Sequence, residues 1–215
     1  MKTPARIALG LGLAGMLAAG AAIGLNQQNA TALTEAPQAA AAQPSGPNTF
    51  AVDVGHSSSM FRIKHMGVAN FMGRFNKFDG SYTLDPENLG ASTFDITVDA
   101  ASVDTNSARR DGHVKAADFF DVANHPNITF KSTSAEANGE DSMLVRGDLT
   151  FLGITKTVDV KMNLIGIGDT PQGFKSGVDA YFKFKRSDFG NDTYVASGGL
   201  SDEVEVWISI EGVRR

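Results

Sequence analysis

The chain has 215 residues, no cysteine, and 24 acidic against 19 basic side chains, for a formal net charge of −5. The lack of cysteine excludes disulfides, thiol redox chemistry and a lipid attached through sulfur, so burial of apolar side chains must hold the fold together. The acidic balance argues against a nucleic acid or an anionic membrane surface as the main partner.

The first 25 residues have the layout of a secretory signal. Lys2 and Arg6 precede an uncharged run rich in Gly, Ala and Leu from Ile7 to Leu25, which is a positive segment followed by an apolar one. We expect residues 1–25 to be a signal peptide or, if uncleaved, an N-terminal anchor. Small-residue cleavage motifs occur at both 19–21 and 30–32. The protein is therefore expected to be periplasmic or otherwise exported, and anchored to the inner membrane if the segment is retained.

Residues 26–48 are mainly Ala, Pro, Gln, Thr and Ser, with Glu35 as the single charged residue. Such a segment is too polar and too small in its side chains to form a packed core, which predicts a disordered Ala/Pro/Gln linker. No repeat or second linker follows. We therefore expect residues 49–215 to form one domain.

Within that domain, apolar and polar side chains alternate with a period of two, which is typical of strands that bury one face. In chain order the inward stripes are Phe50, Val52 and Val54; Ser59, Phe61, Ile63 and His65; Phe94, Ile96, Val98 and Ala100; Val145, Gly147, Leu149 and Phe151; Val158, Val160, Met162 and Leu164; Val178, Ala180, Phe182 and Phe184; and Val204, Val206, Ile208 and Ile210. Turn residues separate the stripes, as in an antiparallel meander. Roughly seven or eight such strands predict an all-β domain, either a closed barrel or a sandwich.

One stretch breaks the alternation. Residues 107–117 show no period of two, and Thr105 or Ser107 could cap a short helix there. The residues thus predict a sheet domain with one helical excursion.

Eight groups of residues along this domain occur together and in order. They are Val52-Asp53 with His56-Ser57, Phe61-x-Ile63-Lys64-His65-x-Gly67, Gly73-x-Phe75-x-x-Phe78-x-Gly80, Arg110-Asp111-x-His113, Asp118-Phe119-Phe120-Asp121, His125-Pro126-x-Ile128-Thr129-Phe130, Gly147-x-Leu149-Thr150-x-x-Gly153-Ile154-Thr155-Lys156, and Arg186-Ser187-Asp188-Phe189-Gly190. In this combination the chain resembles the YceI family of periplasmic, lipocalin-like polyisoprenoid-binding proteins.

The resemblance implies an eight-stranded antiparallel lipocalin-like β-barrel, extended by a helix, with an elongated apolar tunnel. The tunnel would take a long isoprenoid chain such as a quinone tail or a polyprenyl phosphate, and related members accept fatty-acid-like amphiphiles. Ser59 stands where the family usually has an aliphatic residue. Gly112 lowers the helix propensity of the helical segment.

A barrel of about eight strands is either filled by side chains or holds one small ligand, and both interpretations remain open from the residues. Inward Gly147 and Ala180 favour unfilled space beside large phenylalanines, although a glycine in a strand can also mark a bend. The residues expected to bind the ligand in the interior and at the mouth are Phe61, Ile63, His65, Phe75, Phe78, Phe119, Phe120, Leu149, Phe151, Phe182 and Phe184.

A polar cluster surrounds the helical segment. Arg109, Arg110 and His113 are candidate contacts for a ligand head group, because arginine grips phosphate through parallel hydrogen bonds. The competing interpretation, which we favour, is a lattice of ion pairs with Asp118 and Asp121 that pins the helix across the barrel. His65 likewise is either a head-group contact or a structural histidine paired with a carboxylate.

No enzyme chemistry is expected. The four histidines are scattered without metal-ligand spacing, so we predict no metal site and no resident cofactor. Ser187 beside Asp188 lacks a histidine base and a nucleophile elbow, which argues against a hydrolase. Outward Trp207 hints at a homodimer contact.

The leading hypothesis is therefore a binding protein for a polyisoprenoid or related long-chain lipid, for transport, storage or sequestration, driven by burial of apolar area. The main alternative is an accessory that presents or senses quinone beside a membrane cytochrome partner. An enzyme acting on isoprenoid phosphates is a third hypothesis, motivated only by the arginines.

Overall fold

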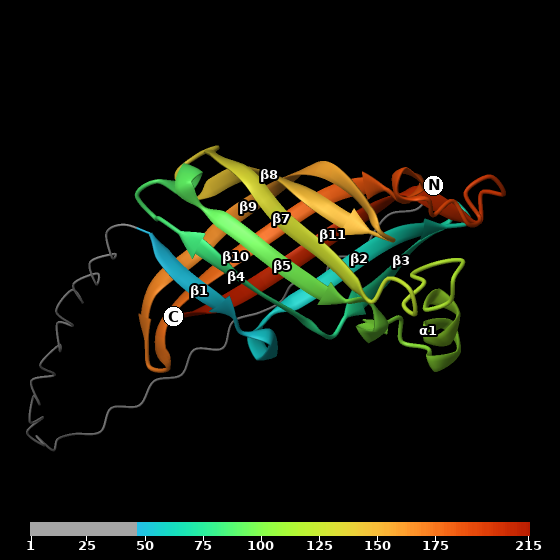
Figure 1. Ribbon diagram of the computed structural model, residues 1–215, viewed down its shortest axis with the longest axis horizontal. Coiled ribbons are helices and arrows are strands. Elements are labelled where there is room, and N and C mark those ends of the chain that lie inside the picture. The colour runs from blue at the N-terminus through green and yellow to red at the C-terminus, as the bar shows by residue number, and fades with distance from the viewer. Residues whose placement is uncertain (1–46) are drawn as a thin grey trace, which may run out of the picture. The chain divides into compact units, whose positions relative to one another are not determined.

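The computed structural model describes residues 47–215 (Figure 1). The expected signal peptide or anchor, and the expected linker up to residue 46, lie outside the described residues. The elements are β1 (Asn48–Val52), η1 (Val54–His56), β2 (Ser58–His65), β3 (Ala69–Phe75), β4 (Phe78–Leu84), η2 (Leu89–Ala91), β5 (Thr93–Asp99), η3 (Ala100–Ser102), β6 (Val103–Asp104), α1 (Ala108–Val114), β7 (Asn127–Ala137), β8 (Ser142–Phe151), β9 (Ile154–Thr170), β10 (Gly173–Lys185), η4 (Arg186–Phe189) and β11 (Leu200–Arg214), where η marks a short 3₁₀ helix.

The alternation in sequence becomes alternation in burial. Along β8, Val145 and Leu149 are buried while Arg146 between them is exposed, and β5 and β10 show the same pattern. Each of the seven stripes contributes to a strand, as expected for chains whose successive side chains point to opposite faces. Two stripe residues lie outside the strands. Val54 is in η1 and is 39% exposed, because the chain turns out of the sheet after Val52. Ala100 is the first residue of η3 and is buried.

Within residues 47–215, eight antiparallel strands close a ring in the order β1, β4, β5, β7, β8, β9, β10 and β11. Closure comes from β1, whose Phe50 pairs with Tyr82 of β4 on one side and with Arg214 of β11 on the other. The all-β, eight-stranded barrel with a short helical excursion is confirmed. A closed ring leaves no strand edge there, which is how barrels avoid edge-to-edge association.

Beyond the ring, other strands extend the wall. After the turn at η1 the chain continues as β2, which pairs with β11 between Leu200 and Ser209, and β3 and β6 follow next to it. Figure 1 shows β1 and the C-terminus at one end of the barrel and α1 at the other. The two ends of the barrel therefore have different constructions.

The α-helix and its cap agree with the sequence. Ser107 caps α1 by accepting a hydrogen bond from the backbone N–H of Arg110, at a donor–acceptor distance of 3.5 Å. Among residues 47–215, no helix has both the length and the apolar character needed to cross a bilayer.

Aromatic side chains fill the barrel at the end that carries β1 and the C-terminus. The ring of Tyr82 stacks on Phe50 at 5.3 Å and on Phe94 at 5.7 Å, and Phe174 stacks on the far side of Phe50 at 6.2 Å. The Tyr82 hydroxyl shares a 2.7 Å hydrogen bond with the Ser176 hydroxyl, and burial raises the pKa of Tyr82 to about 12. A side chain at Gly212 would overlap the Tyr82 hydroxyl, so this packing requires glycine there.

We expect Tyr82→Phe to lower the free energy of unfolding by about 1–3 kcal/mol, because the buried Ser176 hydroxyl loses its partner. Urea unfolding would measure the change. Ser176→Ala should have a similar effect, and the double variant should be destabilised by less than the sum of the two. Strict additivity would contradict a direct bond between the two hydroxyls.

Candidate functional site

The barrel encloses a cavity of about 1030 Å³ between the aromatic stack and the end that carries α1. This volume is at the upper end of the range for ligand pockets. Phe94, Val178 and Ile210 belong to its lining near the stack, and Leu200 and His65, which pair across β11 and β2, belong to its lining at the other end. The structure thus answers the question left open by the residues: one end of the barrel is filled and the rest is hollow.

Most residues expected to bind a ligand lie on the cavity wall. These are Phe61, Ile63, His65, Phe75, Phe119, Phe120, Leu149, Phe151, Phe182 and Phe184. Their contact with a ligand stays a prediction. Ser59 and Ala180 are small inward residues on the same wall, and they leave room between these larger side chains.

Two sequence expectations about the interior are wrong. Phe78 is 5% exposed and belongs to the buried hydrophobic cluster, but it is not part of the cavity lining, although its cross-strand partner Val98 is. Gly147 leaves no free space either. A side chain there would overlap the ring of Phe130, which already covers the position.

Phe120 brings the segment after α1 into the cavity. Its ring lies 5.5 Å from Phe75, 5.8 Å from Phe151 and 6.3 Å from Phe61, mostly edge to face. Such arrangements add to the stabilisation from apolar burial. The loop between α1 and β7 therefore covers part of the cavity with an aromatic surface.

Of the two neighbouring arginines on α1, only Arg110 lines the cavity. Its Nε donates to the Thr105 hydroxyl at 3.0 Å and its Nη2 to the Thr105 carbonyl at 2.6 Å, while the guanidinium lies 4.5 Å from the ring centre of Phe71. The expectation for Arg109 is wrong in placement: both arginines are exposed, but Arg109 lies outside the cavity lining. Successive helical residues point about 100° apart, so the two arginines cannot share one direction.

The expected lattice of ion pairs between the arginines and Asp118 and Asp121 is not present among the described residues; each of these carboxylates lies beside a histidine instead. His113 Nε2 lies 3.2 Å from an Asp118 carboxylate oxygen, and His125 lies 3.9 Å from Asp121. In the described part of the chain, no ion pair involves Arg109 or Arg110. His113 also packs edge-on against Phe119, with ring centres 5.0 Å apart, and it contributes to the cavity wall.

Arg186 is a cavity residue that the sequence analysis did not single out as functional. It is 4% exposed, and its three nitrogens donate to the carbonyls of Ser201 and Thr193 and to the Asn191 side chain at 2.6–2.9 Å. Burial lowers the pKa of Arg186. A usable signal was present: Arg186 continues the inward stripe that runs through Phe182 and Phe184.

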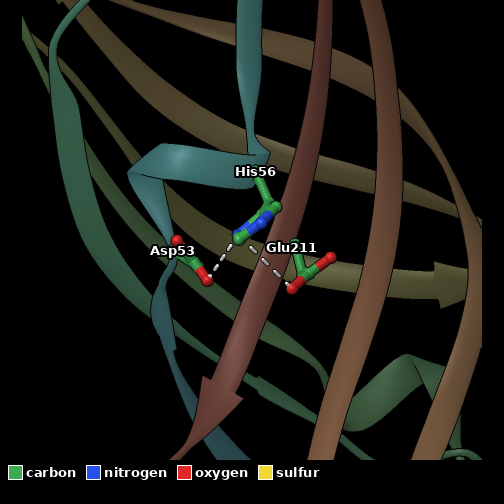
Figure 2. A group of neighbouring side chains, drawn as sticks. All are labelled: Asp53, His56 and Glu211. Carbon is green, nitrogen blue, oxygen red and sulfur yellow. Dashed lines mark hydrogen bonds and ion pairs between the residues drawn. The ribbon is translucent and has the colours of Figure 1, made fainter. Parts of the chain in front are cut away.

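A separate polar cluster lies beside the kink at η1. His56 Nδ1 is 2.9 Å from an Asp53 oxygen and 3.9 Å from a Glu211 oxygen. Figure 2 shows the three side chains converging from η1, from the residue that caps it, and from β11. Their ligand atoms lie within 4.8 Å of one another, a spacing that could suit a cation.

Lys175 already supplies positive charge to this cluster. Its ammonium pairs with Glu211 and lies 3.5 Å from Asp53, and these contacts raise the pKa of Lys175, chiefly through Glu211. A metal ion would have to compete with that ammonium. We therefore interpret the group as an ion-pair clasp that ties η1 to β10 and β11.

Comparison with known proteins gives a consistent result. A model of the YceI-like domain matches residues 50–212. A UPF0312 protein of Pseudomonas aeruginosa (strain LESB58) is 44% identical over 161 residues, which span 74% of this chain and 83% of that protein.

Solved structures share the fold. BcnA of Burkholderia cenocepacia has a TM-score of 0.68 at 26% identity, over 74% of this chain and 98% of BcnA. A polyisoprenoid binding domain from Saccharophagus degradans, implicated in plant cell wall breakdown, has a TM-score of 0.61 over 77% of this chain and 98% of that domain. At 18% identity, this second likeness shows the fold alone.

The clasp at η1 predicts a pH-dependent contribution to stability. The contact with His56 is the largest cause that lowers the pKa of Asp53. A carboxylate whose pKa is lower in the folded state stabilises the fold above its unfolded pKa of about 3.9, and loses this effect as the pH falls through the folded pKa. Asp53→Asn keeps a capping side chain at η1 but removes the charge.

We expect Asp53→Asn to lower the thermal midpoint at pH 7, and the difference from the unsubstituted protein to vanish in acid well below about pH 4. Differential scanning calorimetry across pH would test this. Asp141→Asn, at an exposed aspartate outside the ion pairs of the described residues, is the matched control. A difference that persisted unchanged at low pH would contradict the role of the charge.

Proposed function

The chain belongs to the YceI-like family, and on that premise we propose that it binds a long-chain amphiphilic lipid of the polyisoprenoid class inside its barrel. The protein acts as a carrier, store or sequestering agent for that lipid and performs no chemistry on it. We further propose that it works after export, in the periplasm.

The observation that carries the proposal is the large cavity with aromatic and aliphatic walls. Its lining follows β11 from Leu200 to Ile210. Ten residues of tilted strand correspond to a length on the order of 25 Å along the barrel axis. This elongated space suits an extended hydrocarbon chain.

The energetics favour long chains. Each buried methylene contributes about 0.8 kcal/mol, so ten of them contribute roughly 8 kcal/mol. Association itself costs about 4–15 kcal/mol. A short chain therefore barely compensates for the cost of binding, whereas a chain that occupies the full cavity binds tightly.

The surroundings of Ser187, the serine considered as a nucleophile in the sequence, also support binding without catalysis. The hydroxyl of Ser187 donates to Asp202 at 2.8 Å, and Ser187 is not part of the cavity lining. No histidine is its partner in the described chain. The Saccharophagus degradans domain with the same fold is described as polyisoprenoid binding, which agrees with the proposal.

Native mass spectrometry of the full chain, expressed with export and purified without detergent, tests the proposal, and organic extraction identifies the bound molecule. We expect one lipid per barrel. An extracted quinone would favour the alternative role beside a membrane cytochrome, and a protein that carries no lipid and takes up none from added long-chain isoprenoids would refute the proposal.

Filling the cavity should prevent binding. Ala180 is 7% exposed and lines the cavity, so the phenyl ring introduced by Ala180→Phe would occupy part of the cavity. We expect co-purified lipid to fall about tenfold or more, with a destabilisation of about 1–3 kcal/mol from overpacking. Lipid content and the thermal midpoint are the two measurements.

Asp179→Phe introduces the same side chain on the exposed face of the same strand, and it should retain its lipid. Ile208→Phe, at the cross-strand partner of Ala180 on the cavity wall, provides a second filled variant. Normal lipid content in both filled variants would place the ligand elsewhere.

A further inference from the structure

The charge inside the cavity is opposite in sign to the charge of the chain. In the part of the chain that the structure describes, the ionisable residues that line the cavity are Arg110, Arg186, two histidines and Tyr194, and no Asp, Glu or Lys contributes to its wall. The whole chain, by contrast, has an excess of five acidic side chains. A cavity wall with two guanidinium groups and no carboxylate attracts a negatively charged ligand more strongly than a neutral one.

Arg186 is a buried cation with neutral partners. Its hydrogen bonds go to two carbonyls and one amide, and no ion pair neutralises it among the described residues. Two carboxylates near it, Asp202 and Asp192, favour its charged form, but neither forms an ion pair with it, and Asp202 is engaged by the N–H and hydroxyl of Ser187. A buried charge that is not fully paired is costly. An anion that enters the cavity would therefore gain from pairing with this guanidinium.

Arg110, unlike Arg186, is exposed, and it too lacks a counter-ion among the described residues. Thr105 accepts its hydrogen bonds, and Asp111 is occupied by the N–H and the hydroxyl of the same threonine. The Nη1 group of Arg110 makes no hydrogen bond within the described residues, so it remains available to a ligand. The face of Phe71 holds the guanidinium in place.

The segments that carry the two arginines are joined. Asn191, which binds Arg186, donates through Nδ2 to the Phe119 carbonyl at 2.8 Å, and Thr193 donates to the Asp118 carbonyl at 2.7 Å. The loop after η4 is thereby attached to the loop after α1. Both arginines therefore belong to the end of the barrel opposite the aromatic stack.

We propose that Arg110 and Arg186 form a head-group site that selects an anionic amphiphile, with a phosphate or carboxylate head, over a neutral quinone or alcohol of the same chain. The inference rests on the proposed binding of a lipid in the barrel. The hydrocarbon chain extends toward the aromatic stack, and the head group stays near α1 and η4.

The test uses three probes that share one hydrocarbon chain. Geranylgeranyl phosphate, geranylgeranoic acid and geranylgeraniol are titrated into delipidated full-length protein by isothermal calorimetry, below their aggregation concentrations. We expect at least one of the two anions to bind roughly ten- to a hundredfold more tightly than the alcohol. The phosphate and the acid separate the two sources of anionic head group, and preference for either supports the site.

Substitutions locate the selectivity. Arg110→Gln should lose about tenfold in affinity for the preferred anion while its affinity for the alcohol stays unchanged. Arg109→Gln, which changes the neighbouring exposed arginine outside the cavity, is the matched control and should behave as the unsubstituted protein. Arg186→Gln should have a larger effect than Arg110→Gln. Arg186→Lys, which keeps the charge if Arg186→Gln does not fold, should retain part of the preference.

The outcomes separate this inference from the proposed function. Equal affinity for all three probes, or an effect of Arg109→Gln as large as that of Arg110→Gln, would overturn the anion site and leave lipid binding intact. Failure to bind any of the probes, together with absence of co-purified lipid, would overturn lipid binding and the anion site together.

Discussion

The closed hydrogen-bonded ring is the constraint on which the rest of the protein depends. Once eight strands close through β1, the width of the interior is set by the backbone, and side chains can only fill it or leave it hollow. At the end that carries β1, the interior is filled by the stacked rings of Phe50, Tyr82, Phe94 and Phe174. Further along the axis, small inward residues such as Ser59 and Ala180 leave space that the backbone cannot close by collapsing inward.

The kink at η1 lets the barrel have two different ends. By turning out of the ring after Val52 and rejoining β11 as β2, the chain extends the wall beyond the filled section, and β3 and β6 widen it. The clasp of Asp53, His56, Glu211 and Lys175 lies at this kink. The clasp ties η1 to β10 and β11 at the point where the chain leaves the eight-stranded ring.

In the proposed complex, the apolar cavity walls and the two arginines contribute differently to ligand recognition. Apolar walls supply an attraction that grows with chain length but that distinguishes head groups poorly. The two cavity arginines, held by neutral acceptors in an otherwise acidic chain, provide the discrimination that the walls lack. In the proposed arrangement the hydrocarbon tail determines the strength of binding and the head group determines its specificity.

The sequence by itself determined the strands and the face of each strand that points inward, because a period of two needs no knowledge of the partner strand. It therefore indicated most of the cavity wall, including Phe61, Phe151 and Phe182. Tertiary structure alone decided which inward positions are packed and which line the cavity: it placed Phe78 in the buried core and covered Gly147 with the ring of Phe130. It also decided that Arg110 and not Arg109 lines the cavity, and it brought Asp53 to Glu211 across the length of the chain. These outcomes depend on bends and contacts between distant segments, and local periodicity carries no information about either.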